Sequence, residues 1–198
     1  MLLADSWLQI NSMKILEFAK IAVETYVKKG KAISADQGLG KEFLTRRAGA
    51  FVTILKDGNL RGCIGTYAPT KKNIAEEIVS NAIAAASEDY RFGPITEDEL
   101  SSLSYEIYIL DEPELIIDPK ELDPKKFGIV VRSAPSSIPT GIDVVFSGHP
   151  RFKSGLLLPD LDGVDTVEQQ ISIACQKAGI NPLKENISIY KFRAKKYE

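Results

Sequence analysis

The sequence FVTILKDGNLRGCIGT, residues 51–66, carries the clearest structural signal in this chain of 198 residues. Residues 51–55 and 60–66 are rich in strand-forming side chains, and the KDGN tetrapeptide at 56–59 contains the Asp-Gly pair typical of a two-residue β-turn. We therefore predict that the two runs pair as antiparallel strands. A tight hairpin favours an α+β fold over a doubly wound parallel sheet, because parallel strands need long crossover connections.

Helices are predicted on both sides of this hairpin from apolar spacing and from capping residues. The predicted helices are residues 13–29 between Ser12 and Gly30, a helix from the Asn73–Glu76 capping box to about Ser87, and a helix from the Asp165–Glu168 capping box to Gly179. The second helix carries an apolar stripe made of Ile74, Ile78, Ala82 and Ala85. The small alanines predict that this helix lies close to the element beneath it.

Strand-forming runs elsewhere in the chain complete the predicted fold, a mixed or antiparallel sheet flanked by helices. These runs are residues 104–110, 128–131, 155–158 and 187–192. Residues 133–154 contain several prolines and glycines around a short apolar run at 142–146, and we predict a long loop with room for one edge strand. Residues 1–12 have neither the basic region nor the cleavage site of a signal peptide, and we predict an N-terminal extension.

The composition predicts a globular, cytoplasmic protein. With 25 Lys and Arg against 27 Asp and Glu, the net charge is -2, which argues against a protein that binds bulk nucleic acid. No window approaches the roughly 18 uninterrupted apolar residues of a membrane span. Two distant cysteines fit a reducing compartment. The single histidine, His149, excludes a multi-histidine zinc site, and no nucleotide-binding or metal-binding motif is present, so we predict neither a metal nor a cofactor.

The hexapeptide LRGCIG, residues 60–65, is the most specific local feature. In a regular strand Arg61, Cys63 and Gly65 share one face, so Arg61 could stabilise a Cys63 thiolate. Gly62 and Gly65 would permit unusual dihedral angles and close approach to the thiol. The alternative is a small buried cysteine beside a glycine bulge, because cysteine is among the most buried residue types.

This hexapeptide lies within GAFVTILKDGNLRGCIGTY, residues 49–67, which resembles the signature of the AMMECR domain family. The resemblance continues through EDYRF at 88–92 and GLLLPDLDGVDTVEQQISIACQKAGI at 155–180, and it covers residues 13–198. The bacterial and archaeal form, which is encoded beside a Memo-like protein and a radical-SAM protein, is the most similar. The resemblance implies one α+β domain with a smaller subdomain, and it leaves residues 133–154 as an atypical insertion.

The resemblance also assigns candidate site residues. Together with the hexapeptide, it implies that the candidate catalytic residues are Cys63, Arg61 and Glu88, and that a binding cleft is lined by Gly62, Gly65, Asn81, Asp89 and Arg91. Tyr90 stands where members of the family often have proline. A second interpretation is a helix cap formed by the charged residues at 88–91, with Asn81 as a polar group that must find a partner inside the apolar stripe.

Three functions stay open at this point. The first is an accessory protein that works with Memo-like and radical-SAM partners through a cleft around the hexapeptide. The second is an enzyme that uses the Cys63 thiol, assisted by a carboxylate, a lysine or a partner, because His149 is interpreted as a surface turn residue and Cys175 as a core residue. The third is binding to RNA or the translation machinery, although a solvated terminal strand is the favoured interpretation of Lys191, Arg193, Lys195 and Lys196.

Overall fold

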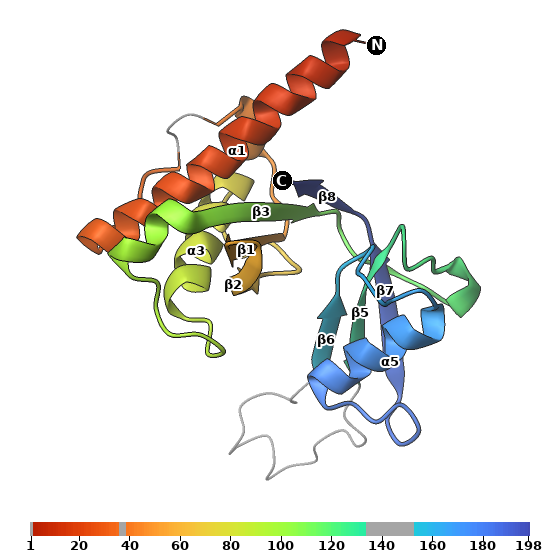
Figure 1. Ribbon diagram of the computed structural model, residues 1–198. Coiled ribbons are helices and arrows are strands. Elements are labelled where there is room, and N and C mark those ends of the chain that lie inside the picture. Colours follow the sequence, from red (N-terminus) through yellow and green to blue (C-terminus); the bar gives the residue numbers. More distant parts are fainter. Residues whose placement is uncertain (1, 36–38, 134–152) are drawn as a thin grey trace, which may run out of the picture. The chain divides into compact units, whose positions relative to one another are not determined.

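The computed structural model describes residues 2–35, 39–133 and 153–198 (Figure 1). The chain divides into two compact units, one formed by the residues up to Asp111 together with Lys195–Glu198, and the other by Glu112–Ala194. Each unit contains a four-stranded antiparallel sheet with helical cover, which confirms the predicted α+β class. Within the described residues, no helix is long and apolar enough to cross a bilayer. The predicted edge strand at 142–146 and His149 lie outside these residues.

The sheet of the first unit has the strand order β2-β1-β3-β8, so β2 is an edge strand. Its strands are β1 (Ala50–Lys56), β2 (Asn59–Gly65), β3 (Leu103–Leu110) and β8 (Ala194–Tyr197). Its helical segments are α1 (Leu2–Lys29), α2 (Lys41–Thr45), α3 (Ile74–Ser87) and the 3-10 segment η1 (Glu97–Ser102). Neither β8 nor η1 was predicted from the sequence, because their residues show little apolar periodicity.

The second unit repeats the plan of a helix packed on a sheet, with the strand order β4-β7-β5-β6. Its elements are β4 (Glu114–Leu115), the 3-10 segment η2 (Pro119–Glu121), β5 (Gly128–Ser133), β6 (Ser154–Leu157), α5 (Val167–Ala178) and β7 (Ile187–Phe192). Helix α5 packs on β5 and β6. Cys175 of α5 is 2% exposed within this unit's apolar cluster, so its interpretation as a core residue is confirmed.

Strands β1 and β2 form the predicted hairpin, with Thr53 opposite Cys63. In the turn, Asp57 has φ 51° and Gly58 has φ 78°. Two successive left-handed residues are what a type I′ turn requires, and this turn matches the natural twist of paired strands. The Asp-Gly signal therefore fixes the hairpin locally, before any contact with the rest of the chain.

The hairpin contains one irregularity, at Arg61. Ile54 lies opposite Gly62, whereas the next residue, Leu55, lies opposite Leu60. Arg61 is therefore the extra residue of a β-bulge, which bends the strand and redirects a side chain. The regular alternation that would place Arg61 on the same strand face as the cysteine is interrupted here.

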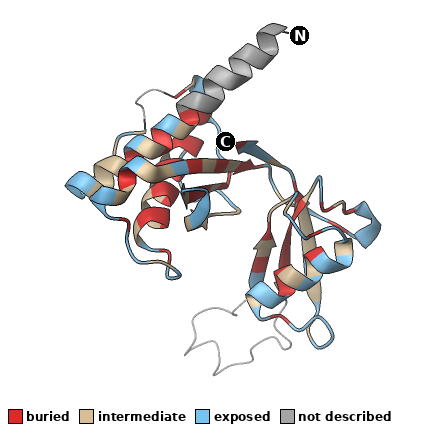
Figure 2. Cartoon of the chain, in the orientation of Figure 1, coloured by how far each residue is buried: buried red, intermediate tan, exposed pale blue. Residues whose placement is uncertain are grey.

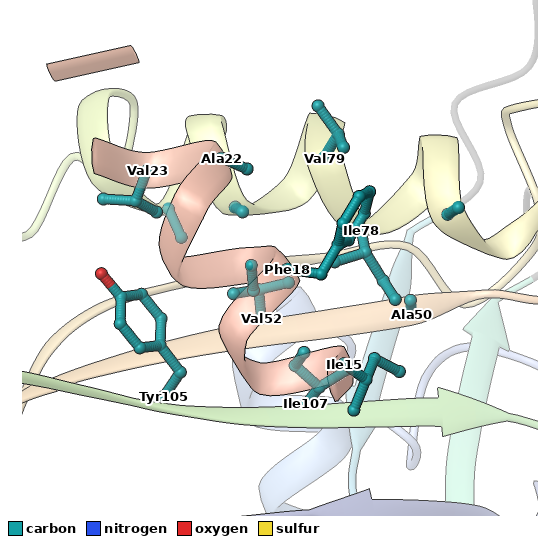
Figure 3. Close-up of a cluster of buried hydrophobic side chains, with 14 of the residues drawn as sticks. Ile15, Phe18, Ala22, Val23, Ala50, Val52, Ile78, Val79, Tyr105 and Ile107 are labelled. Carbon is teal, nitrogen blue, oxygen red and sulfur yellow. The ribbon is translucent and has the colours of Figure 1, made fainter. Parts of the chain in front are cut away.

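One face of the first sheet is buried beneath α1 and α3, as the burial colours of Figure 2 show. In Figure 3, Ile15 and Phe18 of α1 lie with Ile78 of α3 over Val52 and Ile107 of the sheet. The predicted stripe of α3 is confirmed, because all four of its residues are at most 2% exposed, namely Ile74, Ile78, Ala82 and Ala85. Asn73 caps the helix as predicted, since its side chain accepts the Glu76 amide at 2.9 Å.

Two predicted helix starts are wrong. Helix α1 begins at Leu2 rather than after Ser12, because residues 2–12 contain no glycine or proline that would interrupt a helix. Helix α5 is capped by Thr166, with Gln169 completing the capping box, one residue later than the predicted Asp165 pair. Both pairs of residues fit the capping pattern, so the pattern alone does not distinguish them.

The two glycines of the hexapeptide are explained by space rather than by dihedral angles, since neither has a left-handed φ. A Cβ at Gly62 would lie 2.2 Å from the carbonyl oxygen of Ala85 in α3. A Cβ at Gly65 would lie 2.1 Å from the Phe51 ring, which therefore covers this glycine. The unusual dihedral angles expected at these glycines are therefore absent, and the missing side chains leave room for the α3 backbone and for the Phe51 ring.

Gly62→Ala should lower the free energy of unfolding by about 2–3 kcal/mol, because the new methyl group meets helix backbone that cannot move aside locally. Urea denaturation followed by circular dichroism measures this change. Gly93→Ala is the matched control, since a Cβ there meets nothing within 4 Å, and it should change stability by less than about 0.5 kcal/mol. Equal effects of the two substitutions would contradict the close helix–strand contact.

Candidate functional site

Cys63 lies on the sheet face that α1 and α3 leave uncovered. Val52 and Ile54 of β1 are fully buried toward the helices, so the intervening Thr53 and its partner Cys63 point to the opposite face. The Cys63 Sγ lies 3.2 Å from Thr53 Oγ1, where either atom could donate the hydrogen bond. Thr53 is 8% exposed and Cys63 is half-buried, so Cys63 is partly open to solvent.

A polar row continues across the sheet from this contact. Glu106 of β3 lies opposite Thr53, and the Lys196 ammonium bonds to the Glu106 carboxylate at 3.0 Å. Thr53 thus stands between a thiol on one neighbouring strand and a carboxylate on the other. Neither Glu106 nor Lys196 was predicted to lie near Cys63, because only the strand register connects them with it.

Asp89 and Arg91 hold the backbone of Cys63. The Cys63 amide donates to Asp89 Oδ2 at 2.9 Å, and Arg91 Nη2 donates to the Cys63 carbonyl at 3.4 Å. Arg91 also binds the Asp89 carboxylate through Nε at 2.9 Å and Nη2 at 2.7 Å. These hydrogen bonds, first those from the Arg91 side chain, lower the pKa of Asp89 to about 2. The two side chains therefore replace the missing neighbour strand at this point of the sheet edge.

The bulged Arg61 binds the segment that follows Arg91. Its Nε and Nη2 atoms donate to the two Glu99 carboxylate oxygens, each at 2.9 Å. Nη1 donates to the Gly93 carbonyl at 2.9 Å and Nη2 to the Pro94 carbonyl at 3.2 Å. Hydrogen bonds from Arg61 hold the pKa of Glu99 far below its usual value. Residues 89–99 are thus fastened along the edge of β2, an arrangement that we call the edge clamp and that consists of Arg61, Asp89, Arg91, Glu99 and the Cys63 backbone.

The clamp changes the role expected for Arg61. Its guanidinium is occupied by Glu99 and loop carbonyls, so the expectation that Arg61 stabilises the thiolate is wrong. Arg91 is one cation that interacts with Cys63, because the hydrogen bond with Asp89 and, to a smaller extent, the charge of Cys63 raise the pKa of Arg91. The physical cause is the bulge, which turns Arg61 toward the neighbouring segment.

Two further predicted site residues lie apart from Cys63. Asn81 is 5% exposed beneath the sheet, where its Nδ2 donates to the Ala50 carbonyl at 2.9 Å. Glu88 is exposed at the C-cap of α3 and lines a separate pocket of about 670 Å³ with Ile33 and Val79. The structure therefore brings Asp89 and Arg91 to Cys63, but neither Asn81 nor Glu88.

Glu77 is a buried carboxylate that the sequence analysis missed. It is fully buried and accepts four hydrogen bonds, from Thr66 Oγ1 at 2.7 Å, the Thr70 amide and hydroxyl at 2.7 and 2.8 Å, and the Lys71 amide at 2.8 Å. Burial alone would raise the pKa of Glu77, but these hydrogen bonds together lower it. Glu77 thus fixes the loop after β2. Its position beside the apolar stripe of α3, about one helical turn after Ile74, is the sequence feature that could have predicted a buried carboxylate.

The basic residues near the C-terminus have local partners. Lys191 bonds to Glu121 at 2.8 Å, Arg193 lies 4.7 Å from the centre of the Phe127 ring, Lys195 lies 4.8 Å from that of Tyr197, and Lys196 pairs with Glu106. Lys191 and Arg193 belong to the second unit, whereas Lys195 and Lys196 belong to the first. In the part of the chain that the structure describes, no three His, Cys, Asp or Glu side chains converge as metal ligands do.

The family model for AMMECR1 matches residues 16–197. The chain belongs to the AMMECR1 family. A Thermotoga maritima protein is 46% identical over 190 residues, which cover 96% of this chain and 99% of that protein. A Clostridium acetobutylicum protein is 39% identical over 184 residues, but this chain covers only 35% of its length. The crystal structure of the uncharacterized protein PH0010 from Pyrococcus horikoshii has a TM-score of 0.75 at 31% identity, with 92% of this chain and 88% of that chain covered.

The predicted resemblance is thus confirmed. The edge clamp connects two of the segments on which that resemblance rested. The hexapeptide supplies Arg61 and the Cys63 backbone, and the EDYRF segment at 88–92 supplies Asp89 and Arg91. Each segment provides both a donor and an acceptor.

Asp89→Asn should lower the free energy of unfolding by about 2 kcal/mol at pH 7, because it leaves Arg91 without its carboxylate. The native pKa of Asp89 is depressed from 3.8 to about 2, so Asp89 stabilises the fold above that interval and the stability is lost as the pH falls through it. Urea unfolding at several pH values should show a smaller acid-induced loss in the variant. Glu88→Gln, which removes the same charge at an exposed neighbouring position, should behave like the wild type.

Cys63 should react with iodoacetamide at least about tenfold faster than Cys175 in the native protein, because a buried thiol is shielded from reagents. Burial, followed by the charge of Glu185, also raises the pKa of Cys175. Peptide mass spectrometry of timed samples measures the two rates. In urea the rates should converge, and equal rates in the native protein would contradict the placement of Cys63 on an uncovered face.

Proposed function

We propose that this AMMECR1-family protein is an accessory protein that binds partner proteins through the surface around the edge clamp. A Memo-like protein and a radical-SAM protein are the partners that the family resemblance suggests. The observation that carries the proposal is that the charged side chains of the edge clamp bind groups within the molecule. Arg61, Asp89 and Glu99 bind one another's segments or the Cys63 backbone, which is typical of a rigid frame rather than of reacting groups.

This frame presents an aromatic side chain to solvent. Tyr90 lies in sequence between the two clamp residues Asp89 and Arg91 and is 94% exposed. Aromatic side chains on rigid backbone are the residues that most often dominate the energy of protein interfaces, because they bury a large area at little cost in conformational entropy. An exposed tyrosine in a loop fastened by ion pairs therefore favours a docking role.

The relatives are consistent with a domain that acts beside another protein. The Thermotoga maritima relative consists almost entirely of the matched region, whereas the matched region is only 35% of the Clostridium acetobutylicum relative. The domain thus occurs both as nearly a whole chain and as part of a longer one. This pattern is typical of a module that works with a partner, either joined to it or separate from it.

Binding of the full chain to purified Memo-like and radical-SAM proteins from the same organism tests the proposal by isothermal titration calorimetry. Tyr90→Ala should weaken binding to at least one of them by about tenfold or more. Ile117→Ala is the matched control, because Ile117 is an equally exposed apolar residue, 94%, in the second unit. Absence of binding to both proteins at micromolar concentrations, or equal losses from the two substitutions, would contradict the proposal.

A cysteine-dependent enzyme is the second candidate, favoured by the polar row on the uncovered face. Cys63 contacts the Thr53 hydroxyl, which separates it from the Glu106 carboxylate, and the charge of Arg91 couples to the thiol. An enzymatic nucleophile needs a reactive thiolate at neutral pH, whereas a docking surface does not. Alkylation rates of Cys63 measured against pH separate the two functions. A thiol that is fully reactive well below pH 7 would favour the enzyme.

A further inference from the structure

A second pocket of the first unit has no part in the edge clamp. It has a volume of about 550 Å³ and is lined by Arg47, Thr70, Lys71, Lys72 and Glu76. These residues come from the segment just before β1, from the loop between β2 and α3, and from the first turn of α3. All of them belong to one unit, so the pocket is complete within it.

The pocket gathers more positive than negative charge. Three of its five lining residues are cations and one is a carboxylate. None of Arg47, Lys71 and Lys72 forms an ion pair with a carboxylate anywhere in the described ranges, whereas Lys56, Arg61 and Arg91 each do. Like charges held together repel one another, so a pocket that keeps three cations without paired carboxylates attracts an anion.

The walls of this pocket are held in place before any ligand arrives. Arg47 donates through Nε to the Lys71 carbonyl at 3.2 Å and through Nη2 to the Pro69 carbonyl at 3.3 Å. A guanidinium has five N–H donors, so three are left for a ligand. The fully buried Glu77 accepts hydrogen bonds from the backbone amides of Thr70 and Lys71, which fixes the backbone of the loop. The loop therefore does not need to be ordered when a ligand binds.

We propose that this pocket binds a small molecule that carries a phosphate group. An arginine offers paired donors that match phosphate oxygens, and lysines add positive charge without requiring a fixed geometry. A volume of about 550 Å³ is larger than one phosphate ion needs and lies in the range of small-molecule sites, so a phosphate ester fits better than the bare ion. The three cations meet in one pocket instead of following a stripe, and the chain carries a net charge of -2, which disfavours a nucleic-acid backbone.

Titration of the full chain with pyrophosphate, AMP and inorganic phosphate, each followed by calorimetry at physiological salt, tests this site. Arg47→Ala and Lys71→Ala should each weaken the binding of pyrophosphate or AMP by about tenfold or more, because each removes a charged contact with phosphate. Lys41→Ala is the matched control, since Lys41 is an exposed lysine of the nearby α2 that does not line the pocket, and it should leave binding unchanged. Circular dichroism of each variant verifies its fold.

Lys72→Gln gives a milder test, because it removes the charge and keeps a polar side chain only one atom shorter, and it should weaken binding without changing the melting temperature. If the pocket variants lose stability but bind pyrophosphate like the wild type, the cations only balance Glu76 and Glu77, and the proposal is wrong. Equal losses from Lys41→Ala would show non-specific charge attraction and would also overturn it. If a single-stranded RNA binds more tightly than AMP and its binding depends on the same residues, the ligand is a nucleic acid and the small-molecule proposal is wrong.

Discussion

The close contact between α3 and β2 at Gly62 is the constraint on which the candidate site depends. The Ala85 carbonyl occupies the space of a Cβ at this position, so the helix can lie directly against the edge strand. Helix α3 ends at Ser87, and Asp89 follows two residues later. The Asp89 Oδ2 atom accepts the hydrogen bond of the Cys63 amide at 2.9 Å. A side chain at position 62 would push the helix outward and move Asp89 away from the edge that it covers. The clamp is therefore a consequence of a missing side chain.

The second unit has the same two close contacts at glycines as the first, one with a helix backbone and one with an aromatic ring. A Cβ at Gly155 of β6 would lie 2.0 Å from the Ala174 carbonyl of α5, as Gly62 meets α3 in the first unit. Gly128 lies beneath the ring of Phe192, its partner in the neighbouring strand. Two units of different sequence thus place a helix backbone against a strand by removing a Cβ, which identifies close helix–strand contact as a general requirement of this fold rather than an adaptation around the thiol.

The parts of the structure that the sequence predicted are those with local causes. The hairpin follows from Asp57 and Gly58, and the buried stripe of α3 follows from its apolar period, because both signals lie within one element. The parts that it did not predict depend on distant residues. Arg61 binds Glu99 across 38 positions, and the bulge that directs it is visible only in the register with β1. Asp89 and Arg91 of the predicted site contact the Cys63 backbone, whereas Glu88 and Arg61 face other neighbours.

The charges of the edge clamp determine how its geometry depends on pH. The pKa values of Asp89 and Glu99 are both lowered, chiefly by hydrogen bonds from Arg91 and Arg61, so both carboxylates stay charged until the pH falls well below 4. The frame around Cys63 therefore keeps one geometry over the whole neutral range. Among the clamp and its contacts, the thiol is the group whose covalent state changes most readily under cellular conditions. A change at this surface thus has to come from Cys63 itself or from a partner that covers Tyr90, because the ion pairs that hold them do not respond.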